Sequence, residues 1–272
     1  MRSILKLLWA KYWRLQYLRK YGIPFFDTNN MGGKISSSLD LLNGVERIAV
    51  IGKGASIFEN NPIEIIKKCD YKCLLGRVDV ENLEDYIGTD FDAQMTSYVG
   101  IFNSVMPVLS KDLICKSGIR SLFCNTDYAS ERFNIYTQFF HDRVENICCL
   151  PRPSEMAYDP DVYKYCKKGR LTMASGLLRI LYNVPTIKEI YFAGVDAYHY
   201  GYSQQSKEDG KVFLSIKHAT DDPKETHGKP FLSFLFETVI ERDSLFELTV
   251  FFPEVLREHI DFPVHRCFQF YK

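Results

Sequence analysis

A glycine-rich turn is the first place in the sequence where residue types suggest chemistry. The stretch "GKGAS", 52–56, follows the apolar run "RIAVI". Gly52 and Gly54 permit a close approach of the backbone to a phosphate or a base. The dinucleotide fingerprint G-x-G-x-x-G needs a third glycine where the chain has Ile57, and the Gly-Lys-Ser/Thr of a P-loop is absent. The turn therefore weakens the common NAD and P-loop interpretations, and it is also typical of plain α/β architecture.

Two later segments carry polar groups beside the ends of predicted elements. In "MASGLL", Ser175 and Gly176 lie at the start of a predicted helix, where free backbone N–H groups can bind an anion. A helix cap with close packing is the alternative. In "KEIYFAGVDAY", a predicted strand leads to Asp196, and Tyr198 follows it. Both segments place hydrogen-bonding groups where an α/β fold can present them to a ligand.

A polar, turn-rich stretch at 198–228 contains His218 and His227. Long loops are uncommon in compact domains unless they are functional or disordered, and this one begins where a strand ends, as a lid does. A histidine can act as a general base near neutral pH. The alternative is a solvated surface histidine.

A pair of aspartates, Asp90 and Asp92, forms a D-x-D sequence in "GTDFDAQ". Metal-dependent glycosyltransferases use such a pair to hold Mn²⁺ or Mg²⁺ on a diphosphate sugar. A polar turn before the next strand explains the pair as well, and we favour that interpretation. We therefore expect no metal site.

The elements that must position these residues alternate along the chain. Strands are predicted at 47–52, 71–78, 92–102, 119–126, 145–153, 187–198 and 246–254, and helices at 60–70, 106–118, 130–144, 171–185 and 229–244. This alternation predicts an α/β fold with a mostly parallel sheet that is covered by helices on both faces. Ligands of such folds lie at the carboxyl ends of the strands.

Composition and charge are those of a soluble globular protein. The chain has 272 residues, of which 46% are hydrophobic, and its formal net charge of zero gives no electrostatic case for nucleic acid. Its eight cysteines form no C-x-x-C pair. A zinc site is therefore disfavoured, and we expect free buried thiols.

Residues 1–45 are predicted to be a basic amphipathic helix and a linker, with the linker at 23–45. Six basic residues and no acid precede Asp27, and charges interrupt every apolar run. These charges argue against a transmembrane span or a signal peptide. The helix fits the surface of an anionic membrane, or a docking site on its own domain or on a partner subunit.

The order of the short segments resembles that of the sialyltransferases. "VIGKGAS", "ASGLL", "KEIYFAGVDAY", a polar loop and "HGKPFLSFLFE" are similar, over roughly 47–252, to bacterial enzymes of glycosyltransferase family 42. They are more distantly similar to the animal enzymes of family 29. The resemblance implies a single Rossmann-like domain at 46–272, a GT-A variant, with a lid at about 198–228. It also implies inverting, metal-independent transfer of sialic acid, or of a related acidic sugar such as Kdo, from a CMP donor to a surface glycan such as lipooligosaccharide.

The resemblance assigns roles to particular residues. It implies that His227 is the general base and that Tyr198, together with Tyr200 or Tyr202, binds the departing phosphate. The residues implied to lie against the donor nucleotide or its sugar are Gly52, Lys53, Gly54, Ala55, Ser56, Asn125, Ser175, Gly176 and Asp196.

The sequence departs from the family pattern after the second and third predicted strands. Where the family has asparagine, this chain has Arg77, and then Thr96 with Ser97. Arg77 suits a sugar carboxylate through paired hydrogen bonds, which points to a related acidic sugar. The departures also keep two alternatives open: a non-catalytic nucleotide- or glycan-binding relative, and a diphosphate-sugar transferase that uses Asp90 and Asp92.

The resemblance and the basic helix together predict the surroundings of the protein. We expect a cytoplasmic protein that touches the inner face of the cell membrane through its N-terminal helix. Its expected partners are a CMP-sugar donor, a glycan or glycolipid acceptor and further copies of the chain in a homo-oligomer. No cofactor and no nucleic acid is expected.

Overall fold

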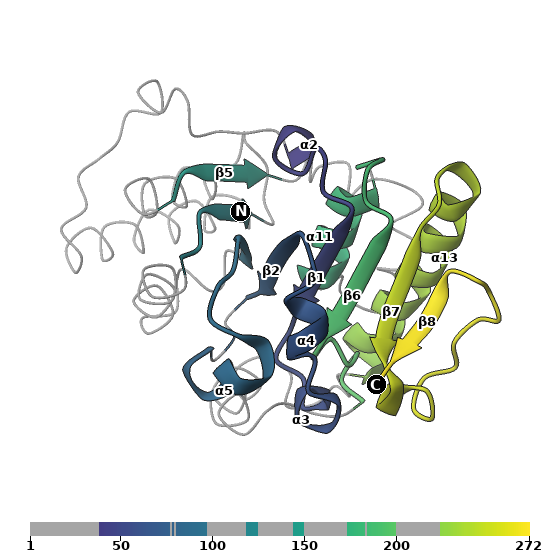
Figure 1. Ribbon diagram of the computed structural model, residues 1–272. Helices are drawn as coiled ribbons and strands as arrows, with labels where there is room; N and C mark the ends of the chain where they lie inside the picture. The colour runs from purple at the N-terminus through teal and green to yellow at the C-terminus, as the bar shows by residue number, and fades with distance from the viewer. Residues whose placement is uncertain are drawn as a thin grey trace, which may run out of the picture.

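One parallel sheet organises the part of the chain that the structure describes. The structure is a computed structural model, and it describes residues 38–76, 78, 80–96, 118–124, 144–149, 173–182, 184–199 and 224–272. Within these ranges eight strands form one sheet in the order β5-β4-β3-β2-β1-β6-β7-β8, and every neighbouring pair is parallel (Figure 1). The strands are β1 (Arg47–Ile51), β2 (Tyr71–Leu75), β3 (Ala93–Thr96), β4 (Ser121–Cys124), β5 (Asn146–Cys149), β6 (Glu189–Ala193), β7 (Thr249–Pro253) and β8 (Phe268–Tyr271).

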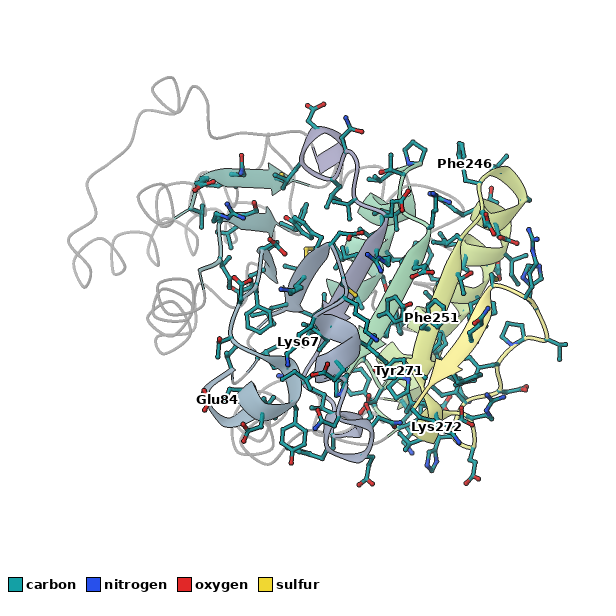
Figure 2. All side chains as sticks on the ribbon, in the orientation of Figure 1. Lys67, Glu84, Phe246, Phe251, Tyr271 and Lys272 are labelled. Carbon is teal, nitrogen blue, oxygen red and sulfur yellow. The ribbon has the colours of Figure 1, made fainter. Side chains whose placement is uncertain are left out.

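Helices lie on both faces of this sheet (Figure 1). Those in front, in the view of Figure 1, are α3 (Ser56–Asn60), α4 (Ile63–Ile66) and α5 (Val80–Ile87), and those behind are α11 (Met173–Tyr182) and α13 (Lys229–Leu245). Short helices also occur at α2 (Ser38–Leu41), η2 (Lys224–Gly228) and η3 (Glu254–Leu256). β1, β6, β7 and β8 end toward the lower part of the view, where Lys272 follows β8, whereas Phe246 follows α13 at the upper edge (Figures 1 and 2). We name these the carboxyl edge and the amino edge of the sheet.

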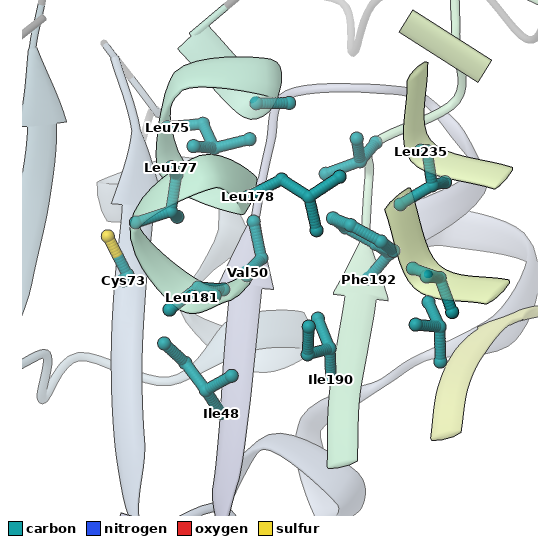
Figure 3. Close-up of a cluster of buried hydrophobic side chains, with 14 of the residues drawn as sticks. Ile48, Val50, Cys73, Leu75, Leu177, Leu178, Leu181, Ile190, Phe192 and Leu235 are labelled. Carbon is teal, nitrogen blue, oxygen red and sulfur yellow. The ribbon is translucent and has the colours of Figure 1, made fainter. Parts of the chain in front are cut away.

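The continuous apolar run of β1 follows from this two-sided cover. Ile48 and Val50 belong to the cluster that packs under α11 and α13 (Figure 3), whereas Ala49 and Ile51 belong to the cluster under α3, α4 and α5. All four side chains are at most 1% exposed. Burial of each larger side chain contributes roughly 1.5–3 kcal/mol, so both faces of β1 hold the layers together.

The predicted α/β fold with a parallel sheet is confirmed. Each of the seven predicted strands contains an observed strand. The predicted helices at 60–70 and 171–185 contain α4 and α11, and the predicted helix at 229–244 matches α13 except for its last residue. Nearly all of the predicted helices at 106–118 and 130–144 lies outside the described residues. The sequence analysis missed β8 and α5, although the apolar side chains of Val80, Leu83 and Ile87 recur at the spacing of one buried helix face.

The predicted linker at 23–45 is described from residue 38 onward, and this part packs against the domain. Leu42, after α2, is fully buried in the cluster under α11 and α13, and its carbonyl oxygen accepts a hydrogen bond from the Thr186 hydroxyl at 3.4 Å. The packed domain therefore includes residues before 46. The predicted N-terminal helix lies outside the described residues, as does most of the predicted lid.

Candidate functional site

The strand order creates a switch point between β1 and β6. From β1 the chain adds β2, β3, β4 and β5 on one side, and it then returns to place β6, β7 and β8 on the other. Connections after β1 and β6 therefore leave the carboxyl edge in opposite directions. Open parallel sheets bind their ligands in the crevice at such a point. The two turns there, 52–56 after β1 and 194–199 after β6, hold half of the site residues that the sequence analysis singled out.

Backbone hydrogen bonds join these two turns. The N–H of Gly52 donates to the carbonyl of Ala193 at 2.7 Å, and the N–H of Gly54 donates to that of Gly194 at 2.7 Å. A side chain at Gly52 would overlap the Gly194 carbonyl, and one at Gly54 would overlap the Asp196 carboxylate. The glycines are therefore required by the packing of one turn on the other, which is the architectural interpretation of "GKGAS".

Asp196 fastens the two turns from inside. Its side chain is 4% exposed and accepts two hydrogen bonds from Ser56, one from the backbone N–H at 3.0 Å and a shorter one from the hydroxyl. Burial raises the pKa of this carboxyl from 3.8 to about 6, although both hydrogen bonds from Ser56 act to lower it. Ser56 is itself fully buried. Asp196 and Ser56, both predicted to bind the ligand, thus form a buried clamp that joins the two turns.

The turn after β6 has an unusual backbone. Gly194, Ala197 and Tyr198 have φ values of 63°, 46° and 67°. The left-handed region costs a residue with a side chain about 1 kcal/mol, and such strain gathers at functional sites. The N–H of His199 donates to the Asp196 carbonyl at 2.8 Å and closes the turn. Tyr198 is half-buried at its end.

The start of α13 touches the same turn. A side chain at Gly228 would overlap the Ala197 carbonyl, so η2 and α13 approach the turn as closely as a glycine allows. Residue 227 directly precedes this contact. The structure therefore brings the backbone of His227 next to the turn that carries Tyr198.

Two long helices begin at the carboxyl edge, because each runs back along the sheet to the strand that follows it. These are α11, with Ser175 and Gly176 buried in its first turn, and α13. Their N-terminal ends direct positive dipole ends toward this edge, which favours an anionic ligand there.

Other predicted site residues lie outside the described residues: Arg77, Asn125, Tyr200 and Tyr202. Among the described residues, Gln94 is a buried polar residue near the carboxyl edge that the sequence analysis did not single out. This β3 side chain is 1% exposed, and its amide nitrogen donates to the carbonyl of Gly76 at 2.6 Å, whereas its amide oxygen has no partner among the described residues. A glutamine within the apolar run of a buried strand is the signal that could have found it.

Asp90 and Asp92 lie at the opposite, amino edge, because they directly precede β3. The Asp92 carboxylate accepts the backbone N–H of Lys72 at 2.8 Å, and the Lys72 ammonium lies 3.4 Å from the Asp90 carboxylate. Within the described ranges, no three metal-binding side chains gather. The aspartates therefore belong to a polar turn at the edge opposite the switch point.

Comparisons with known proteins bear on the fold of this chain. The sequence matches no known family and no curated protein. Among solved structures it is similar to the monofunctional alpha-2,3-sialyltransferase Cst-I of Campylobacter jejuni, with a TM-score of 0.52, 17% identity and 81% of each chain covered. The chain has the fold of the bacterial sialyltransferases. The resemblance inferred from the sequence is thereby confirmed at the level of the fold.

Two further structures support this fold. An apo alpha-2,3-sialyltransferase of Campylobacter jejuni gives a TM-score of 0.50 at 16% identity, over 81% of this chain and 80% of its own. A variant of the sialyltransferase Cst-II in complex with CMP gives a TM-score of 0.51 at 13% identity, over 76% of this chain and 80% of its own. Within the described residues of this sialyltransferase-like chain, no helix is both long enough and apolar enough to cross a membrane.

Proposed function

We propose that this chain is an inverting, metal-independent glycosyltransferase that moves sialic acid, or a related acidic sugar, from CMP to a glycan. The observation that carries the proposal is the convergence of three segments at the switch point of a sialyltransferase fold. These are the turn after β1, the strained turn that ends in Tyr198, and the start of α13 beside His227.

The proposed donor site uses the residues that the sequence analysis assigned. CMP lies against the turn 52–56 and the first turn of α11, at Ser175 and Gly176. Tyr198, with Tyr200 or Tyr202, donates hydrogen bonds to the phosphate. In the sequence, Asn125 directly follows β4 and Arg77 comes two positions after the end of β2, which supports a place for both at the carboxyl edge. There Arg77 would pair with the sugar carboxylate, and Asn125 would lie near the sugar.

The proposed reaction is a single displacement at the anomeric carbon. The acceptor hydroxyl oxygen forms the new bond to that carbon while the bond from the carbon to the phosphate oxygen breaks. CMP leaves with the electron pair, and its phosphate is stabilised by tyrosine hydroxyls and helix N-termini in place of a metal. His227 takes the proton of the acceptor hydroxyl. One displacement inverts the anomeric centre.

The proposed acceptor is a membrane-borne surface saccharide such as lipooligosaccharide. The support is in the sequence, where six basic residues and no acid precede Asp27. A basic amphipathic segment of this kind is attracted to anionic lipid. It would hold the enzyme at the inner face of the membrane, where a lipid-linked acceptor is exposed.

The first experiment is a thermal-shift series with CMP, UDP, GDP and NAD, each with and without EDTA. A ligand that binds the folded state alone raises the unfolding midpoint. A rise with CMP that EDTA leaves unchanged supports the proposal. Transfer from CMP-Neu5Ac and CMP-Kdo is then measured, with His227→Ala as the inactive control.

Two outcomes would contradict the proposal. A rise with UDP or GDP that EDTA abolishes would favour a diphosphate-sugar transferase built on Asp90 and Asp92. A rise with CMP but no turnover of any CMP-sugar would favour the non-catalytic relative, with the departures at Arg77 and Thr96 as its cause.

A further inference from the structure

A tyrosine hydroxyl from β8 forms a hydrogen bond next to the candidate site. Tyr271 of β8 is 8% exposed, and its hydroxyl donates to the Phe192 carbonyl at 2.6 Å. Phe192 directly precedes Ala193 and Gly194, whose carbonyls accept the N–H groups of the turn after β1. Tyr271 lies close to the carboxyl edge, on the face of the sheet that carries Phe251 (Figure 2). The hydrogen bond of Tyr271 therefore lies one residue before the carbonyls that join the two turns.

The register of β6 and β7 explains why a side chain is needed there. The N–H of Thr249 donates to the carbonyl of Lys188 at 2.7 Å. In a parallel pair of strands, every second residue of one strand donates its backbone N–H to the other strand. After Thr249, the next donors of β7 toward β6 are therefore Phe251 and residue 253, and their acceptors are the carbonyls of Ile190 and Phe192. Residue 253 is proline, which has no N–H. The carbonyl left without its ladder donor is that of Phe192, the one that Tyr271 reaches.

A second contact of Tyr271 points to the same pair of turns. Its backbone carbonyl accepts a hydrogen bond from the Asn60 side chain at 3.4 Å. Asn60 is the last residue of α3, the short helix that follows the turn after β1. Tyr271 thus holds the end of β6 through its hydroxyl and the end of α3 through its backbone.

We propose that Tyr271 is a positioning residue of the nucleotide site, an inference that rests on the proposed function. Its hydroxyl replaces the ladder donor that Pro253 lacks. It thereby fixes the end of β6, from which the turn to Tyr198 departs. Without the hydroxyl, the Phe192 carbonyl is left without its hydrogen-bond donor, and a buried carbonyl without a donor destabilises the structure around it. The end of β6 and the turn on it would shift to relieve that destabilisation.

The test compares two variants that each remove one phenol hydroxyl. Tyr271→Phe removes the donor to Phe192. Tyr191→Phe is the matched control. Tyr191, on β6, lies on the same face of the sheet as Tyr271, but its hydroxyl donates to the Glu189 carboxylate at 2.9 Å, away from the turns. Hydrogen exchange of the amides at Gly52 and Gly54 reports on the joined turns directly, and it needs no ligand.

We expect exchange at 52–54 to be roughly tenfold faster in Tyr271→Phe and unchanged in Tyr191→Phe. The Kd for CMP, measured well below the unfolding midpoint, should rise roughly five- to tenfold in Tyr271→Phe alone, since small displacements of a site weaken its contacts strongly. General destabilisation would lower the concentration of folded protein and leave this Kd unchanged. Unchanged exchange at 52–54, or faster exchange spread equally over α11 and α13, would overturn the inference.

A second-site variant tests the ladder argument itself. Pro253→Ala supplies a backbone N–H at the position that the register assigns to Phe192. In the double variant with Tyr271→Phe, this N–H should return exchange at 52–54 most of the way to that of the parent protein. A double variant that exchanges as fast as Tyr271→Phe would overturn the assignment of the hydroxyl as a ladder donor. If the parent protein does not bind CMP, the proposed function and the nucleotide role of Tyr271 fail, whereas a change in exchange still shows that the hydroxyl anchors the turns.

Discussion

Asp196 joins two turns that lie 140 positions apart in the chain, through both hydrogen bonds from Ser56. Because burial raises the pKa of the Asp196 carboxyl to about 6, this carboxyl changes its charge in weakly acidic solution. In the unfolded chain the pKa of an aspartate is near 3.9. The folded state therefore binds the proton more tightly than the unfolded state over the interval between these two values.

This difference predicts a pH dependence of stability. As the pH rises from about 4 to about 6, Asp196 loses its proton in the unfolded chain before it does so in the folded protein. The free energy of unfolding of the parent protein therefore falls, relative to that of Asp196→Asn, by up to roughly 3 kcal/mol. The asparagine keeps one acceptor for Ser56 and does not titrate. Urea denaturation of both proteins at pH 4.5 and pH 7 measures the change. An equal difference at both pH values would show that the Asp196 pKa is not raised in the fold.

Gly228 offers a second prediction at the residue scale. A methyl group there would overlap the Ala197 carbonyl and push the start of α13 away from the turn before Tyr198. Overpacking of this kind costs about 1–3 kcal/mol, and we expect Gly228→Ala to reduce the proposed sugar transfer at least roughly tenfold, because it would displace His227, the proposed base.

The matched control for this variant is Gly88→Ala. Gly88 has a φ of 78° but no atom within 4 Å of an added side chain, so the control adds backbone strain without displacing α13. It should lose stability and keep transfer activity per folded molecule. Equal activity in both variants would contradict a role for the Gly228 contact.

The sequence indicated the types of these residues but not their partners. Gly52 and Gly54 stand out in "GKGAS", yet what excludes side chains there is the turn that carries Gly194 and Asp196. Sequence spacing cannot reveal a contact between positions so far apart. The short distance between Gly228 and Ala197 was likewise hidden, because a polar stretch separates them in the sequence.

At the scale of elements, helix α11 joins the site to the core. Its first turn carries Ser175 and Gly176, and its later turns carry Leu177, Leu178 and Leu181, which pack on β1 and β6 (Figure 3). The strong apolar spacing of this helix made it predictable. Strand β8 was not, because "FQFY" is short and three of its four residues are aromatic, so it shows no clear alternation between apolar and polar residues.

Truncation of a leucine tests how much α11 depends on this packing. Leu178 is 2% exposed, and Leu178→Ala should lower the free energy of unfolding by about 2–5 kcal/mol, because it removes buried contacts and leaves a cavity. Leu245→Ala is the control, since Leu245 is 64% exposed at the end of α13, and its loss should stay within roughly 0.5 kcal/mol. Urea denaturation measures both, and a small loss in Leu178→Ala would mean that α11 packs less closely than described.

At the scale of the whole molecule, the candidate site lies at the carboxyl edge of the sheet that the described residues form. Every strand pair is parallel, so all carboxyl ends meet at one edge, and the fold class alone placed the candidate turns there. The alternation of elements was enough to predict this arrangement. The strand order was not, because the switch between β1 and β6 depends on which strands pair and not on their order along the chain.

The basic N-terminal segment gives a prediction for the whole protein. Lysine and arginine near an anionic bilayer contribute about 1 kcal/mol each, so the full chain should sediment with phosphatidylserine-containing vesicles at low salt and be released at high salt. A form that begins at residue 37 keeps the buried Leu42 and should lose this binding while it keeps CMP binding. Equal sedimentation of both forms, or equal binding to pure phosphatidylcholine, would contradict a membrane role for residues 1–36.

The parallel direction of β8 also matters to anyone who handles this protein. Because β8 runs the same way as β6, Lys272 lies at the edge where the candidate site opens (Figure 2). A polyhistidine tag attached after Lys272 would begin beside Tyr271, at the same edge of the sheet as the turns against which we propose that CMP binds. A tag on the N-terminal side would instead enter the domain through α2, at the far edge of the sheet. Purification handles and fluorescent fusions are therefore best placed before the domain, and a low affinity measured with a C-terminal tag should be repeated after the tag is cleaved.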